Sequence, residues 1–127
     1  MSDVLIDSSV WISFFKGNSA VKKLSELISA NRICTNNLIL SELLPAIIQK
    51  KENHLIDLLY QVKLITLEIN WKEIIDLQAI NLKNGINNVG IPDLIILQNA
   101  TQNMIQLYSL DPHFKLMSKL HSIKLFV

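Results

Sequence analysis

The sequence predicts a three-layer α/β sandwich, in which a mainly parallel sheet lies between layers of helices. Short apolar runs of strand length alternate along the chain with longer segments whose apolar residues recur at helical spacing. This order is typical of parallel strands joined by helical crossovers. The length of 127 residues suits one domain, and 50% of the residues are hydrophobic, enough for a sizeable core. No linker, repeat or break in composition divides residues 1–127, which are therefore expected to form a single domain.

The first half of the chain is predicted to open with a strand that ends at an acid. Residues 4–6 form a short apolar run that stops at Asp7. Ser8 or Ser9 is then expected to cap a helix that runs through residues 11–15. The further elements expected in this half are a helix over 19–30, a strand over 32–35, a helix from Asn36 or Asn37 to about residue 50, and a helix marked by Leu55, Leu58 and Leu59.

The second half continues the alternation of strands and helices. Pro92 sits where the first turn of a helix prefers proline, and "NGINNVG", residues 84–90, is the clearest loop. Trp11 and Trp71 have aliphatic neighbours at helical spacing, so both are interpreted as core residues rather than as platforms for bases. The expected elements are a strand over 62–67, helices over 71–83 and from Pro92 to about residue 103, a strand over 105–110, a short helix opened by Asp111 and Pro112, and a final strand over 122–127.

The composition argues against several classes of protein. A net charge of +1 argues against a strongly basic nucleic-acid coat, although it leaves room for a local basic groove. A single cysteine, Cys34, rules out an intramolecular disulfide and indicates the reducing cytoplasm. No apolar stretch is long enough to span a membrane, so no membrane partner is expected. The pairs Lys22–Lys23 and Lys50–Lys51 are interpreted as solvated helix faces rather than as phosphate contacts.

Four acidic residues occupy unusual positions in the sequence. Asp7 and Asp111 each follow a predicted strand directly, so both should stand at the edge formed by the carboxyl ends of the parallel strands. Glu42 is the lone charge in the apolar run "LILSELLPA", and Asp93 lies in the first turn of a predicted helix. Taken singly, each has a structural explanation: a helix cap for Asp7 and Asp111, an exposed helix face for Glu42, and the helix dipole for Asp93.

Taken together, the four acids predict a site for a divalent cation. Carboxylates gathered at one edge repel one another and are desolvated, so a positive charge is needed to hold them. Mg²⁺ or Mn²⁺, which prefer oxygen ligands, fits this requirement best. Such an ion binds a phosphate oxygen and generates a hydroxide for in-line attack. Ser9 is a candidate contact to a phosphate or to metal-bound water, and its alternative role is the helix cap.

Four segments of the chain resemble the sequence motifs of PIN-domain nucleases. "LIDSSVWISFF" is similar to the first motif, with Asp7 on its acid and Ser9 on its hydroxyl. "TNNLILSELL" is similar to the second motif, with Glu42 on its acid. "GIPDLIILQNA" and "LYSLDPHF" are similar to the third and fourth motifs, with Asp93 and Asp111 on their acids. The size of the chain and its Trp at position 11 look most like VapC-type toxins of toxin–antitoxin pairs.

The resemblance implies a PIN-like fold and an endoribonuclease that depends on Mg²⁺, for which Mn²⁺ can substitute. It implies that Asp7, Asp93 and Asp111 hold the metal and that Glu42 ligates it or lies close by. All four acids would then be catalytic, with a metal-activated water hydrolysing RNA phosphodiesters. The implied substrates are structured RNAs such as transfer or ribosomal RNA, and the implied partners are a small cognate antitoxin and a second copy of the chain.

Three departures from the motifs leave other interpretations open. Pro45 lies one turn after Glu42, where it removes a helix hydrogen bond and could re-aim that acid. Ile96 and Leu97 stand where small residues are usual, and His113 stands where a further acid is common. His113 is either a weaker metal neighbour or, as we favour, a surface residue. The alternatives to a nuclease are a catalytically silent PIN-like module that binds RNA or protein, and an oligomer subunit whose acids are only helix caps.

Overall fold

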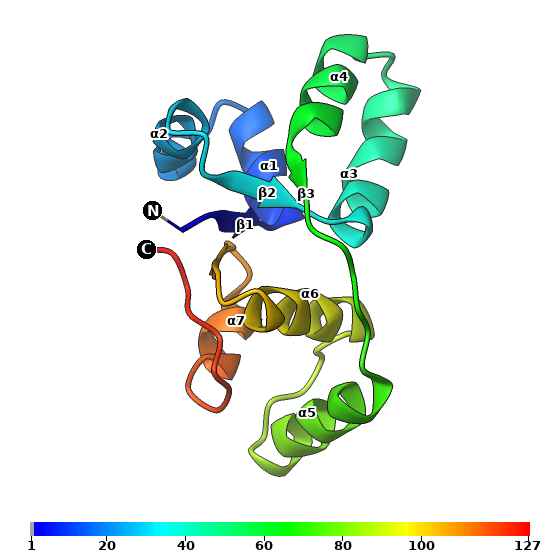
Figure 1. Ribbon diagram of the computed structural model, residues 1–127, viewed down its shortest axis with the longest axis vertical. Helices are drawn as coiled ribbons and strands as arrows, with labels where there is room; N and C mark the ends of the chain where they lie inside the picture. Colours follow the sequence, from blue (N-terminus) through cyan, green and yellow to red (C-terminus); the bar gives the residue numbers. More distant parts are fainter. Residues whose placement is uncertain (1) are drawn as a thin grey trace.

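A four-stranded parallel sheet forms the centre of the computed structural model, which describes residues 2–127. The strands are β1 (Val4–Ile6), β2 (Ile33–Thr35), β3 (Lys63–Leu64) and β4 (Gln106–Tyr108). Their order is β3-β2-β1-β4, and all three pairings are parallel. In Figure 1, α2 (Lys23–Ser29), α3 (Asn37–Gln49) and α4 (Asn53–Gln61) lie above the sheet. Below it lie α5 (Trp71–Lys83), α6 (Ile91–Gln102) and α7 (Pro112–Met117). The predicted three-layer sandwich is therefore confirmed.

The central strand β1 (Val4–Ile6) is covered on both faces, and all three of its side chains are fully buried. An interior strand of a parallel sheet has no solvent-facing side, which explains the continuous apolar run. Leu5 lies opposite Cys34 on one neighbouring strand and Leu107 on the other.

Two predicted strands are wrong in extent. Of residues 62–67, only Lys63–Leu64 form a strand, because the segment that follows is bound by α6 (Ile91–Gln102) instead of the sheet. Asn99 of α6 donates to the carbonyl of Thr66 at 3.1 Å, and Gln102 donates to the carbonyl of Glu68 at 2.9 Å. The strand expected over 122–127 is reduced to an isolated bridge between Leu107 and Leu125.

The helices follow the predicted positions closely. They are α1 (Ser8–Phe15), α2 (Lys23–Ser29), α3 (Asn37–Gln49), α4 (Asn53–Gln61), α5 (Trp71–Lys83), α6 and α7 (Pro112–Met117). The helix expected over 19–30 is divided into a 3-10 turn, Ser19–Val21, and α2. Within residues 2–127, none of the helices combines the length and the apolar character needed to cross a membrane.

Two predictions about individual side chains are wrong. Neither Ser8 nor Ser9 caps α1, because the helix already begins at Ser8 and its N-cap residue is Asp7, whose side chain makes no capping bond. Trp71 is 58% exposed at the start of α5 and is not a core residue, whereas Trp11 is fully buried as expected. The first turn of a helix has no preceding turn to cover its side chains, so helical spacing alone does not decide burial there.

Buried amide side chains hold α3 against α6. Of the two asparagines expected to open this helix, Asn36 is the N-cap residue of α3, and it accepts from the amide of Ile39 at 2.9 Å. Its own amide donates to Asn99 Oδ1 at 2.9 Å, and Asn99 donates in turn to Thr66. Asn36 and Asn99 are both almost completely buried. Because buried polar groups with several partners fix a single geometry, this chain of bonds sets the spacing of the two helices.

Replacing Asn99 should therefore destabilise the protein more than the small size of this side chain suggests. Asn99→Ala leaves the buried amide of Asn36 without its acceptor, and we expect a loss of about 2–3 kcal/mol in the free energy of unfolding. Gln102→Ala is a matched control, because Gln102 binds the same connecting segment from the exposed side of α6. Urea unfolding should show less than about 0.5 kcal/mol for the control. Equal losses in the two variants would contradict this role for the buried pair.

Candidate active site

Asp7 stands at the carboxyl end of the central strand, where the sheet meets α1. Its backbone amide donates to the carbonyl of Tyr108 at 2.9 Å, which fixes it beside the end of β4. Its side chain is buried, and Oδ2 accepts hydrogen bonds from the hydroxyls of Ser9 and Ser109, each at 2.7 Å. Asp7 therefore occupies the predicted N-cap position of α1, but its side chain does not cap the helix. The carboxylate binds hydroxyls instead of helix amides.

Asp111 follows β4 and serves as the N-cap residue of α7. Its Oδ1 accepts from the backbone amide of His113 at 2.9 Å, which confirms the predicted cap. The same oxygen lies 2.9 Å from Nδ1 of the His113 ring. That ring is only 32% exposed, so the favoured interpretation of His113 as a plain surface residue is not confirmed. Within the described chain, Oδ2 of Asp111 makes no side-chain hydrogen bond.

Glu42 and Asp93 complete an acid cluster with Asp7 and Asp111. Partial burial, followed by the charges of Asp7 and Asp93, raises the pKa of Glu42, while a hydrogen bond from Ser8 opposes the shift. Partial burial, followed by the charges of Asp111 and Asp7, raises the pKa of Asp93. A backbone hydrogen bond from Gly90 opposes that second shift most. The charges of two other acids of the cluster thus act on Glu42 and two on Asp93, as expected for carboxylates brought to one edge of a sheet.

The departures in the motifs do not take the acids out of the cluster. Helix α3 continues through Pro45 to Gln49, and Glu42 still senses the charges of Asp7 and Asp93. Ile96 and Leu97 are buried with their neighbours because α6 is covered by protein over most of its circumference. The larger side chains therefore fill the core under α6 and leave its N-terminal Asp93 at the site.

The cluster is suited to an open, hydrated cation site rather than to a closed metal cage. Among residues 2–127, no three His, Cys, Asp or Glu side chains converge closely enough to hold an ion by themselves. Mg²⁺ typically takes one or two carboxylates and keeps several waters, so the oxygen-only donor set fits it. Asp7 and Asp111 each retain one carboxylate oxygen without a hydrogen-bond donor in the described chain.

One hydroxyl at the site was not expected from the sequence. Ser109 donates to Asp7 Oδ2 at 2.7 Å. Ser109 lies two residues before Asp111, at the end of a predicted strand. A polar residue at a strand end was a usable signal for Ser109, but its pairing with Asp7 depends on the parallel register of β1 and β4.

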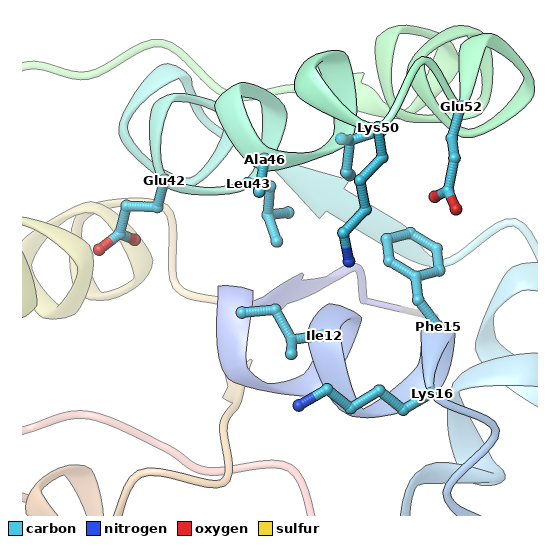
Figure 2. A pocket seen from close by; sticks show the side chains of 9 residues that line it. Ile12, Phe15, Lys16, Glu42, Leu43, Ala46, Lys50 and Glu52 are labelled. Carbon is cyan, nitrogen blue, oxygen red and sulfur yellow. The ribbon is translucent and has the colours of Figure 1, made fainter.

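An apolar groove of about 270 Å³ opens beside the acid cluster, between α1 and α3. Glu42 lies at one end of it and Glu52 at the other, with Lys50 pointing down between the helices (Figure 2). Its walls are formed by Ile12 and Phe15 of α1 and by Leu43, Ala46 and Ile47 of α3. Since Glu42 belongs both to the groove and to the cluster, an occupant of the groove reaches the site.

The raised pKa of Glu42 predicts a pH-dependent change in stability. The pKa of Glu42 is raised above its usual value of 4.5. The folded protein therefore holds the proton of this carboxyl group more tightly than the unfolded chain does. Its charge therefore costs stability at neutral pH, and this cost disappears as the pH falls toward 4.5. We expect Glu42→Gln to raise the melting temperature at pH 7.5 without divalent cations, with a gain that shrinks on acidification. Glu68→Gln, at an exposed position, is the control; a gain that grows on acidification would contradict the repulsion.

Solved structures resemble this chain over nearly its whole length. A DNA-bound VapBC from Salmonella typhimurium matches with a TM-score of 0.77 and 15% identity, covering 99% of this chain and 98% of that one. VapBC2 from Rickettsia felis, bound to a promoter DNA fragment, matches with a TM-score of 0.74 and 16% identity over 97% and 96%. FitAcB from Neisseria gonorrhoeae matches with a TM-score of 0.73 and 16% identity over 98% and 96%. At these identities the likeness concerns the fold.

The family follows from the sequence itself. No individual curated protein matches the chain. The family model described as the PIN domain, however, matches residues 4–120, a span that includes β1, all four acids of the cluster and α7. The chain belongs to the PIN domain family.

Proposed function

We propose that this chain is a Mg²⁺-dependent endoribonuclease, with Mn²⁺ as a substitute, and the toxin of a toxin–antitoxin pair. The observation that carries the proposal is the acid cluster. Four carboxylates from four separate segments share one edge of the sheet, although burial and mutual repulsion raise the pKa values of Glu42 and Asp93. Acids with perturbed pKa values cluster at functional sites. We also propose that residues 1–127 form one domain; Met1 lies outside the described residues.

The roles of the four acids follow from their surroundings. Asp7, Asp93 and Asp111 would hold the cation, and Glu42 would ligate it through water. A bound Mg²⁺ supplies charge for the phosphate oxygens and lowers the pKa of a water molecule. Glu42, whose own pKa is raised, is suited to take a proton from the attacking water. With the cation bound, these residues would support hydrolysis of an RNA phosphodiester by water.

The Ser9 hydroxyl is restricted by the bonds that it already makes. Its proton goes to Asp7, and its oxygen accepts from the amide of Leu110 at 3.0 Å. A phosphate oxygen needs a donor, which Ser9 no longer supplies. Of the two contacts considered for Ser9, we therefore retain the one to water, whose proton its remaining lone pair can accept.

The proposed inhibitory partner is a small cognate antitoxin seated in the groove between α1 and α3. The solved structures that share this fold include complexes described as VapBC and a toxin–antitoxin complex from Klebsiella pneumoniae. The groove has apolar walls, and it begins at Glu42. A protein segment that buries apolar side chains there would cover the acid cluster and keep RNA out.

The remaining proposals concern the substrate, the assembly and the compartment. The substrate class is a structured RNA, such as transfer or ribosomal RNA. The assembly is a homodimer, for which the exposed Ile48 and Tyr60 offer apolar surface. The proposed compartment is the cytoplasm. Cys34 is buried, and desolvation raises the pKa of its thiol to about 12. It is therefore an unreactive structural thiol.

Metal-dependent cleavage of RNA is the direct test of the proposed function. Purified protein should cut total cellular RNA into discrete fragments with Mn²⁺. Asp7→Asn or Asp93→Asn should abolish cleavage while leaving the fold intact, because each removes a proposed ligand. Denaturing gels of the products are the measurement, and EDTA should stop the reaction.

The control variant is Asp76→Asn, since Asp76 is an exposed acid on α5 paired with Lys72. It should cut at the wild-type rate. Either cluster variant cutting RNA at the wild-type rate would remove that residue from the mechanism. A folded, antitoxin-free protein that fails to cut RNA from its own host would instead favour the catalytically silent binding module.

Blocking the groove should separate inhibition from catalysis. Ala46 lines the groove on the exposed side of α3 and lies outside the acid cluster. Ala46→Arg should keep its RNA cleavage and its ability to arrest growth, but co-expressed cognate antitoxin should no longer relieve the arrest. Growth curves with and without the antitoxin are the measurement, and Gln102→Ala is the surface control. Full relief of the arrest in Ala46→Arg would place the antitoxin elsewhere.

A further inference from the structure

Two serine hydroxyls from opposite ends of the chain converge on one oxygen of Asp7. Ser9 lies in the first turn of α1, and Ser109 follows the end of β4. Both donate to Oδ2 at 2.7 Å, and the two hydroxyl oxygens lie 3.4 Å apart. Oδ1 has no hydrogen-bond donor in the described chain. The two oxygens of the carboxylate therefore have different surroundings.

The backbone of the β4–α7 connection fixes the direction of both hydroxyls. The amide of Leu110 donates to Ser9 Oγ at 3.0 Å, and the amide of Asp111 donates to Ser109 Oγ at 3.0 Å. A serine hydroxyl has a single proton. Since each oxygen already accepts an N–H group, that proton is directed to Asp7. Ser109 thereby links the carboxylate of Asp7 to the backbone of Asp111, a second acid of the cluster.

We propose that Ser109 is a positioning residue that, together with Ser9, holds Oδ2 of Asp7 so that Oδ1 is the oxygen offered to the cation. The inference rests on the proposed function and deepens it by assigning separate roles to the two oxygens. A ligating carboxylate is normally oriented by hydrogen bonds from its second oxygen. Ser109 also ties Asp7 to the start of α7, so its hydroxyl sets the spacing between two acids that come from opposite ends of the chain.

Two other serines of the chain, unlike Ser109, bind only carbonyl groups a few residues earlier in the sequence. Ser118, the C-cap residue of α7, donates to the carbonyl of Lys115 three residues earlier. Ser41 donates to the carbonyl of Asn37 within its own helix. Neither bond involves an acid of the cluster. Ser118→Ala is therefore a matched control for loss of a hydroxyl that plays no part in the site.

The test compares the full wild-type chain with Ser109→Ala, Ser109→Thr and Ser118→Ala, all without RNA. Titration calorimetry measures Mn²⁺ affinity, the ¹³C shift of the Asp7 carboxyl carbon in metal-free protein reports its hydrogen bonds, and thermal unfolding reports stability. We expect Ser109→Ala to bind Mn²⁺ about 10-fold more weakly and to shift the Asp7 resonance. Ser109→Thr, which keeps the hydroxyl, should restore both, and Ser118→Ala should match wild type.

The outcomes distinguish this inference from the proposed function. A wild-type chain without a saturable Mn²⁺ site would overturn the proposed function and the cation role of Asp7 together. A wild-type chain that binds Mn²⁺, with Ser109→Ala binding it equally well, would overturn only the positioning role. A lower melting temperature with unchanged Mn²⁺ affinity would make Ser109 structural, which also overturns it. Should Ser109→Ala fail to fold, Ser109→Cys replaces it, because a thiol keeps the volume but is a weak donor.

Discussion

The strand-end carboxylate of Asp7 is the constraint on which the rest of the site depends. It is 5% exposed at the end of the most buried strand, where an acid is costly unless it is paired or hydrogen-bonded. The protein satisfies one of its oxygens with two hydroxyls, and among residues 2–127 no donor reaches the other. Because the sheet is parallel throughout, the same edge also receives Asp111 from β4. The parallel topology thus brings together acids that lie far apart in the sequence.

The buried amides complete the arrangement by placing the two acids that do not follow strands. Asn36 caps α3 and binds Asn99 of α6. The helices that carry Glu42 and Asp93 are therefore joined by a bond that is independent of the acids. This separation has a physical advantage, since charges that repel one another cannot also hold the site together. The buried amide bonds hold the helices in place against the repulsion between the acids. The acids therefore remain available for chemistry.

The sequence was most informative where a pattern is local and repeated. The strand over residues 4–6, the helix over 71–83 and the helix opened by Asn36 or Asn37 depend on apolar spacing and local polar residues, and all three were predicted. Predictions failed where distant partners decide the outcome. The segment after Leu64 leaves the sheet because α6 binds its carbonyls, and Ser109 gains its role from Asp7, 102 residues away. The resemblance to motifs identified the acids, but motifs do not specify their hydrogen bonds.

The distribution of positive charge supports the proposal that the acid cluster binds a cation. The chain has 12 Lys and Arg residues against 11 Asp and Glu, so its total charge is nearly balanced. In the described part of the chain, however, the lysine ion pairs are made with Asp3 and Asp76, neither of which belongs to the cluster. His113, beside Asp111, is the one basic side chain that contacts a cluster acid there. A group of four carboxylates with so little compensation of its own is the kind of site that a divalent ion stabilises. The cation of the proposed function would therefore bind where the protein's own charges remain unbalanced.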